Sequence, residues 1–174
     1  PSTPRSSQKR SALAIAVSEA GGLGSLPCAM LAPDALREEL TRIRAATSRP
    51  VAVNFFCHVP PTVDERREAS WRNRLSPYFR ELGIDAGSLP SGPGRSPFSA
   101  ELADAIEPFA PPVVSFHFGL PSPELVARVR GWGAKILSSA TTVAEARWLA
   151  DHGVDAVIAQ GSEAGGHRGL FLGT

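Results

Sequence analysis

A histidine and a group of glycines each follow a stretch of β-rich sequence. His117 lies near the end of VVSFHF (113–118), and QGSEAGGHRG (160–169) follows the apolar run AVIA (156–159). A histidine titrates close to neutral pH and can accept or donate a proton. A glycine-rich turn lets backbone N–H groups approach an anion or the edge of a heteroaromatic ring. These segments allow acid–base chemistry beside a bound ligand, but for His117 taken alone a hydrogen-bonded core histidine is the favoured interpretation, and a structural turn is a serious alternative for the glycines.

Alternation along two predicted strands decides which side chains share a face. If the aromatic residues of 113–118 meet covering helices, Ser115 and His117 face the opposite side. Asn54 is the one polar residue of VAVNFF (51–56). A buried amide needs hydrogen-bond partners, so Asn54 either contacts a ligand or ties down a neighbouring loop.

The charged residues of the glycine-rich loop allow two interpretations. His167 and Arg168 can attract an anionic substrate, whereas Glu163 can pair with them in a loop salt bridge that contributes little to stability. The glycines match neither the dinucleotide pattern GxGxxG nor the phosphate loop GxxxxGK[ST]. No metal site is expected, because neither HxxxH nor HxH spacing occurs among His58, His117, His152 and His167.

The composition is that of one soluble globular domain, and the overall charge names no partner. The chain has 174 residues, of which 43% are hydrophobic and 20% charged, and its net charge is +1. That balance gives no basic surface for nucleic acid, and no apolar run approaches the roughly 20 residues that cross a bilayer. Cys28 and Cys57 lack CxxC spacing, which predicts free buried thiols. We therefore expect a cytoplasmic protein without a nucleic-acid or membrane partner.

Apolar periodicity predicts strands that alternate with helices. Ser122 and Pro123 predict the start of one helix, and Thr142 with Glu145 forms a Thr-x-x-Glu capping box at another. Such alternation implies parallel strands with functional residues at their carboxyl ends. The predicted strands cover 51–56, 113–118, 136–140 and 156–159, and the predicted helices cover 11–20, 33–48, 60–82, 99–109, 122–133 and 141–153.

Several strings in this order resemble the nitronate monooxygenase family, formerly called 2-nitropropane dioxygenase. They are AVSEAGGLGSL (16–26), VAVNFFCH (51–58), VVSFHFGLP (113–121), KILSSATTVAEARWL (135–149) and DAVIAQGSEAGGHRG (155–169). The resemblance implies an α/β fold, the TIM (β/α)8 barrel, with FMN as cofactor. It also implies oxidation of alkyl nitronates, such as propionate 3-nitronate, with O2 to a carbonyl product and nitrite.

The resemblance also implies roles for individual residues. His117 would be the active-site base or the residue that orients the substrate. Gly22 and Gly24 would let the first loops approach the flavin ring. The implied cofactor contacts are Gly22, Gly24, Asn54, Gln160, Gly165 and Gly166.

The matched segments correspond to about strands 2 to 6 of the eight in such a barrel. We therefore expect residues 1–15 to be a poorly matching segment and 16–174 to be an incomplete FMN-binding TIM-barrel domain. An open sheet would expose its edges, which makes oligomerisation an expected consequence. Two alternatives stay open: another FMN barrel oxidoreductase resembling enoyl-thioester reductases, and an inactive truncated fragment that serves as a structural or interaction module.

Overall fold

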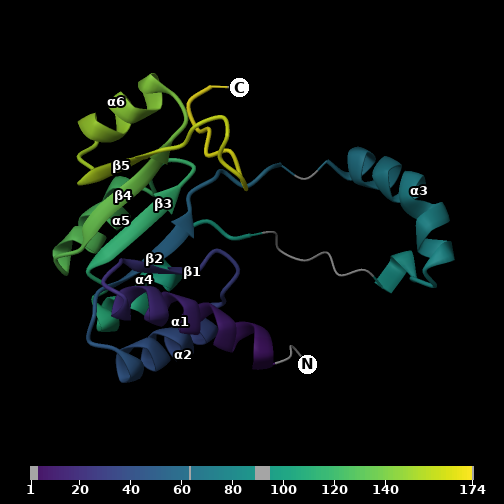
Figure 1. Ribbon diagram of the computed structural model, residues 1–174. Helices are drawn as coiled ribbons and strands as arrows, with labels where there is room; N and C mark the ends of the chain where they lie inside the picture. Colours follow the sequence, from purple (N-terminus) through teal and green to yellow (C-terminus); the bar gives the residue numbers. More distant parts are fainter. Residues whose placement is uncertain (1–3, 63, 89–94, 174) are drawn as a thin grey trace. The chain divides into compact units, whose positions relative to one another are not determined.

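The computed structural model describes residues 4–62, 64–88 and 95–173, and the chain forms two compact units (Figure 1). The smaller unit, Val59–Gly94, contains helix α3 (Glu65–Glu81) and the 3₁₀ turn η1 (Ala86–Ser88). The Asp64 side chain caps α3 by accepting a hydrogen bond from the backbone N–H of Arg67 (3.0 Å). Of the two helices predicted between the second and third strands, the one over 60–82 lies in the smaller unit and the one over 99–109 lies in the larger unit.

The larger unit is built on a parallel sheet whose strand order follows the sequence, β1-β2-β3-β4-β5. Each strand pairs with the next in parallel, so all carboxyl ends lie along one edge of the sheet. The predicted α/β class is confirmed, and the four predicted strands are correct to within one residue at each end. The strands are β1 (Gly24–Pro27), β2 (Val51–Phe56), β3 (Val113–His117), β4 (Lys135–Ala140) and β5 (Ala156–Ala159).

Among the described residues, four α-helices of this unit begin within two residues of the predicted start, whereas the first begins at Pro4 and not at residue 11. Thr142 and Glu145 form the predicted capping box, whereas the Ser122 side chain makes no capping hydrogen bond although it occupies the N-cap position. The first helix continues without a break across residue 15. The predicted boundary between a poorly matching segment, 1–15, and the barrel domain, 16–174, stays a prediction. The helices are α1 (Pro4–Glu19), α2 (Pro33–Ala46), α4 (Ala100–Ile106), the 3₁₀ turn η2 (Glu107–Phe109), α5 (Pro123–Gly131) and α6 (Val143–Asp151).

The two faces of the sheet differ in burial. Val114 and Phe116 are fully buried in the hydrophobic core with the helices, as predicted. Ser115 and His117 therefore face the other side. Phe118, which alternation placed on the side of Val114 and Phe116, instead has a positive φ, and its ring lies 4.4 Å from that of His117. At the β5 edge all four strand residues are exposed, and Ile158 is 43% exposed, as expected of an open sheet. Both cysteines are free, with Cys28 buried and Cys57 half-buried.

Gly24 lies where α1 crosses the amino end of β1. A Cβ atom at this position would overlap the carbonyl oxygen of Ala14 in α1. The hydroxyl of Ser18 accepts a hydrogen bond from the N–H of Gly24 (3.0 Å) and donates to the carbonyl of Pro50 (2.7 Å). The close approach of helix and strand therefore requires glycine here.

A buried carboxylate attaches the C-terminal segment to helix α6. Oε1 of Glu145 accepts hydrogen bonds from the N–H groups of Phe171 (2.7 Å) and Leu172 (3.2 Å). Oε2 accepts from the N–H groups of Thr141 (2.7 Å) and Thr142 (3.1 Å) and from the Thr141 hydroxyl (2.8 Å). Burial by itself raises the pKa of Glu145, but these hydrogen bonds outweigh it and lower the pKa to about 2. The carboxylate is therefore ionised and fully bonded in the fold.

None of the helices in the described part of the chain is long and apolar enough to cross a membrane.

Replacing Glu145 with Gln should lower the free energy of unfolding by about 2 kcal/mol, because an amide cannot accept from all these donors. A carboxyl whose pKa is depressed in the fold stabilises it above its unfolded pKa of about 4.3 and loses that contribution as the pH falls toward about 2. Urea unfolding at several pH values measures both effects. As the pH falls from about 4.3 to about 2, the free energy of unfolding of Glu145→Gln should decrease less than that of the native chain. An equal decrease in both proteins would contradict an ionised Glu145 in the fold.

Replacing Gly24 with Ala should lower the free energy of unfolding by about 1 to 3 kcal/mol, because the new methyl group overlaps backbone. Gly131→Ala is the matched control, since a Cβ there meets nothing within 4 Å. Thermal and urea unfolding of the two variants give the comparison. Equal stability would show that α1 does not approach β1 as closely as described.

Candidate active site

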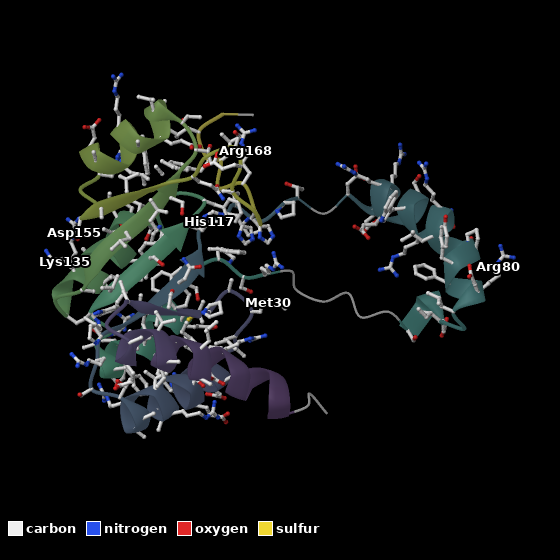
Figure 2. All side chains as sticks on the ribbon, in the orientation of Figure 1. Met30, Arg80, His117, Lys135, Asp155 and Arg168 are labelled. Carbon is white, nitrogen blue, oxygen red and sulfur yellow. The ribbon has the colours of Figure 1, made fainter. Side chains whose placement is uncertain are left out.

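His117 is the last residue of β3 and pairs with Phe56, the last residue of β2. Figure 2 shows His117 near the end of the strands where Arg168 lies, and shows Lys135 and Asp155 at the opposite end of the strands. Those two residues form an ion pair of 2.8 Å at the start of β4 and just before β5. His117 therefore lies at the carboxyl edge, where parallel α/β folds place their reactive groups.

The loop after β5 folds back onto His117. Nε2 of Gln160 donates to the carbonyl of His167 (2.8 Å), and the N–H of Gly169 donates to Oε1 of Gln160 (2.7 Å). The same His167 carbonyl lies 3.1 Å from Nε2 of His117. The Gln160 side chain thus connects the start of the loop to residues 167 and 169. The His167 carbonyl oxygen that it bonds also lies next to the His117 imidazole.

Aromatic rings surround the imidazole of His117. The ring centroid of Phe118 lies 4.4 Å away and that of Phe56 lies 5.7 Å away, and Phe56 also lies 5.5 Å from the ring of His167. Burial lowers the pKa of His117 below its ordinary value, although the hydrogen bond to the His167 carbonyl opposes part of that shift. The imidazole is therefore neutral at neutral pH, as a general base must be.

A strained turn follows His117 directly. Phe118 has a φ of +68° and Gly119 has a φ of +89°, and a positive φ is uncommon for a bulky residue. The buried hydroxyl of Ser138 donates to the carbonyl of Gly119 (2.9 Å). A Cβ at position 119 would lie 3.1 Å from Cδ2 of Phe171. The surrounding contacts hold this turn, and with it the direction of the His117 side chain.

A cavity of about 280 Å³ opens at the carboxyl ends of β4 and β5. Gly166 adopts a φ of +82° in its wall. Within the described residues, Arg168 makes no ion pair and no three His, Cys, Asp or Glu side chains are grouped to hold a metal ion. An amide, a guanidinium and exposed backbone can hold an anion or the polar edge of a ring. The lining residues are Thr141, Gln160, Gly161, Ser162, Ala164, Gly166 and Arg168.

Asn54 bonds to the neighbouring strand. Its Nδ2 donates to the hydroxyl of Ser115 (2.8 Å) and to the Ser115 carbonyl (3.3 Å). Asn54 and Ser115 are register partners on the face that carries His117. The amide therefore crosslinks β2 and β3 close to the site, and it does not line the cavity.

The structure does not bring the predicted glycines together. Gly166 lines the cavity, and Gly165 precedes it with open space around the position of a Cβ. Gly24 instead pairs with Val51 at the amino end of the sheet, opposite the edge that carries His117, and Gly22 precedes it on that side. The packing of α1 accounts for the glycine at 24, and the contact of Gly22 and Gly24 with a flavin stays a prediction.

Sequence reasoning missed two residues beside His117. Arg95 contacts Nε2 of His167, and its guanidinium carbon lies 5.7 Å from the centroid of the Phe56 ring. His58 lies edge-on to Phe56, with its Nδ1 buried and unbonded among the described residues. Arg95 follows a Gly/Pro/Ser-rich stretch and lies 72 residues before His167, so no spacing rule connects the two.

Comparison with known proteins gives one consistent family. A family model described as nitronate monooxygenase matches residues 3–174. Nitronate monooxygenases from Paraburkholderia phytofirmans and Pseudomonas aeruginosa are each 41% identical over 92% of this chain. The chain spans about half the length of these curated relatives, 44% and 46% respectively.

Solved structures agree with the sequence comparison. Nitroalkane oxidase from Streptomyces ansochromogenes superposes with a TM-score of 0.82 at 38% identity, over 94% of this chain and 46% of that one. FabK from Thermotoga maritima gives a TM-score of 0.61 at 27% identity, over 92% of this chain and 39% of that one. The predicted partial TIM barrel is confirmed by the five parallel strands and by this coverage. The chain belongs to the nitronate monooxygenase family.

Proposed function

We propose that this chain is part of an FMN-dependent nitronate monooxygenase. The whole protein would oxidise alkyl nitronates, such as propionate 3-nitronate, with O2 to a carbonyl product and nitrite. The family match over residues 3–174 supports the reaction class. The observation that carries the proposal in the structure is the contact of both His117 and Gln160 with one carbonyl oxygen, that of His167, at the carboxyl edge of the sheet.

The cavity beside Gln160 fits the edge of a flavin ring. Its wall combines a donor and acceptor amide, exposed backbone at Gly161 and Gly166, and the guanidinium of Arg168. Such groups match ring carbonyl and nitrogen atoms or a negative charge. FMN, when bound, supplies the electron acceptor for the oxidation. We propose contacts from Gln160 and Gly166, with Gly165 and Asn54 as neighbours of the same site.

His117 has a defined task when the substrate is a neutral nitroalkane. The C–H bond beside the nitro group must break, the electron pair must move into the nitro group, and the proton must go to a base. An imidazole whose pKa lies below its ordinary value is free to take that proton at neutral pH. A nitronate has already lost the proton, so His117 would only orient it beside the rings of Phe56 and Phe118.

Adding FMN to the purified chain should quench flavin fluorescence in a saturable way. Oxygen uptake with propionate 3-nitronate should then exceed that with FMN alone, without NADH. Oxidation of NADH in place of nitronate would favour the reductase-like barrel. Absence of flavin binding would contradict the enzyme function for this chain and favour the structural or interaction module.

Replacing His117 with Asn should lower kcat/KM for a neutral nitroalkane by about 10²- to 10⁴-fold, the usual contribution of a general base. The value for the corresponding nitronate and the affinity for FMN should change far less. Because the base is active when unprotonated, activity on the neutral substrate should rise with pH through an apparent pKa below about 6.5. His152→Asn is the matched control, since His152 is stacked on Trp148 in α6. Equal losses on both substrates would argue against a base.

A further inference from the structure

The hydrogen bond at Nε2 of His117 fixes where the imidazole carries its proton. A carbonyl oxygen only accepts hydrogen bonds. The His167 carbonyl lies 3.1 Å from Nε2 of His117, so Nε2 must be the donor. In a neutral imidazole the other nitrogen, Nδ1, then holds the lone pair.

The position of that carbonyl depends on Gln160. Its amide donates to the His167 carbonyl at 2.8 Å and accepts from the N–H of Gly169 at 2.7 Å. The two bonds clamp both ends of the segment 167–169. The Gln160 N–H also donates to the carbonyl of Ala140 (2.9 Å), which ties the clamp to the end of β4.

We propose that Gln160 is a positioning residue that, through the carbonyl of His167, holds His117 in its Nε2–H tautomer and leaves Nδ1 as the nitrogen that accepts a proton. Its role is indirect, because Gln160 acts on the imidazole through the loop backbone. The role of Nδ1 as proton acceptor rests on the proposed function. The assignment of the Nε2–H tautomer does not depend on that function.

The backbone at Gly169 passes close to the Cε1–Nδ1 edge of the His117 ring and places no side chain on it. A Cβ there would lie 2.6 Å from Cε1 of His117 and 3.1 Å from Nδ1. Any larger residue would therefore press on the edge that holds the lone pair. Transfer of a substrate proton to Nδ1 would break one C–H bond, leave the electron pair on the nitronate and give an imidazolium that still donates from Nε2.

The groups around His117 agree with a neutral ring. Arg95 contacts Nε2 of the nearby His167, and the rings of Phe56 and Phe118 cover His117. Within the described part of the chain, the imidazole makes its polar contact with the His167 carbonyl. The charge of His167 also acts to lower the pKa of His117.

His152 supplies an internal reference with the opposite tautomer. Its Nδ1 lies 2.7 Å from the carbonyl of Trp148, so the same reasoning requires Nδ1–H and a lone pair on Nε2. One spectrum can therefore test both assignments on a single sample.

The test is a long-range ¹H–¹⁵N correlation spectrum of the full, uniformly labelled chain at about pH 8, where an ordinary histidine is neutral. His117→Gln and His152→Gln assign the two rings. We expect His117 as Nε2–H and His152 as Nδ1–H, with each minor tautomer at least about tenfold less populated. A predominant Nδ1–H form of His117, or equal populations, would overturn the proposal.

Two variants distinguish the effect of the Gln160 hydrogen bonds from that of the neighbouring His167 side chain. Gln160→Leu should lower the ratio of the two His117 tautomers about fivefold, the effect of losing one hydrogen bond of ordinary strength. His167→Gln keeps the backbone carbonyl and should leave the ratio unchanged. An unchanged ratio in Gln160→Leu, or a fall of the same size in His167→Gln, would remove Gln160 from this role.

Gly169→Ala tests access to Nδ1 of His117, because the new methyl group would lie against that edge of the ring. It should shift the ¹⁵N resonance of Nδ1 and depress turnover of a neutral nitroalkane more than turnover of its nitronate. An unperturbed Nδ1 resonance would overturn the proposed access to that nitrogen. If the tautomers are as expected but no nitronate is oxidised, the proposed function fails while the assignment of the tautomer stands.

Discussion

Parallel register is the constraint on which the candidate site depends. Because each strand pairs in parallel with the next, residues at the carboxyl ends of distant segments meet at one edge. Phe56 pairs with His117, and the N–H of Gln160, directly after β5, bonds to Ala140 at the end of β4. A shift of one residue in any strand would turn its site side chain toward the helices.

The side chains of Gln160 and Glu145 hold the glycine-rich loop in one conformation through hydrogen bonds to its backbone. Gln160 bonds both sides of the segment that faces His117, and Glu145 bonds the backbone that follows it at Phe171 and Leu172. Glycine gives the loop access to a positive φ at 166, but glycine alone specifies no single conformation. The order of this loop comes from hydrogen bonds at its two ends.

The open sheet explains why the site is only partly enclosed. The helix-facing side chains of β3 are fully buried, whereas His117 on the opposite face is half-buried and β5 is exposed. The cavity at the ends of β4 and β5 is correspondingly small, about 280 Å³. The chain spans about half the length of its relatives, and the residues that it contributes to the site all come from strand ends and the loops that follow them.

The sequence alone determined the order of β2 to β5 and of the helices between them, because apolar periodicity and local caps such as Thr142 with Glu145 act within a few residues. It also predicted that His117 and Gln160 follow strands, and the structure places His117 at the end of β3 and Gln160 directly after β5. It gave little sign of β1, whose four residues include glycine and proline, or of the close approach of α1 to Gly24. Only the tertiary structure decided that Arg95 contacts His167 and that one carbonyl bonds both His117 and Gln160, since such contacts join residues far apart in the chain.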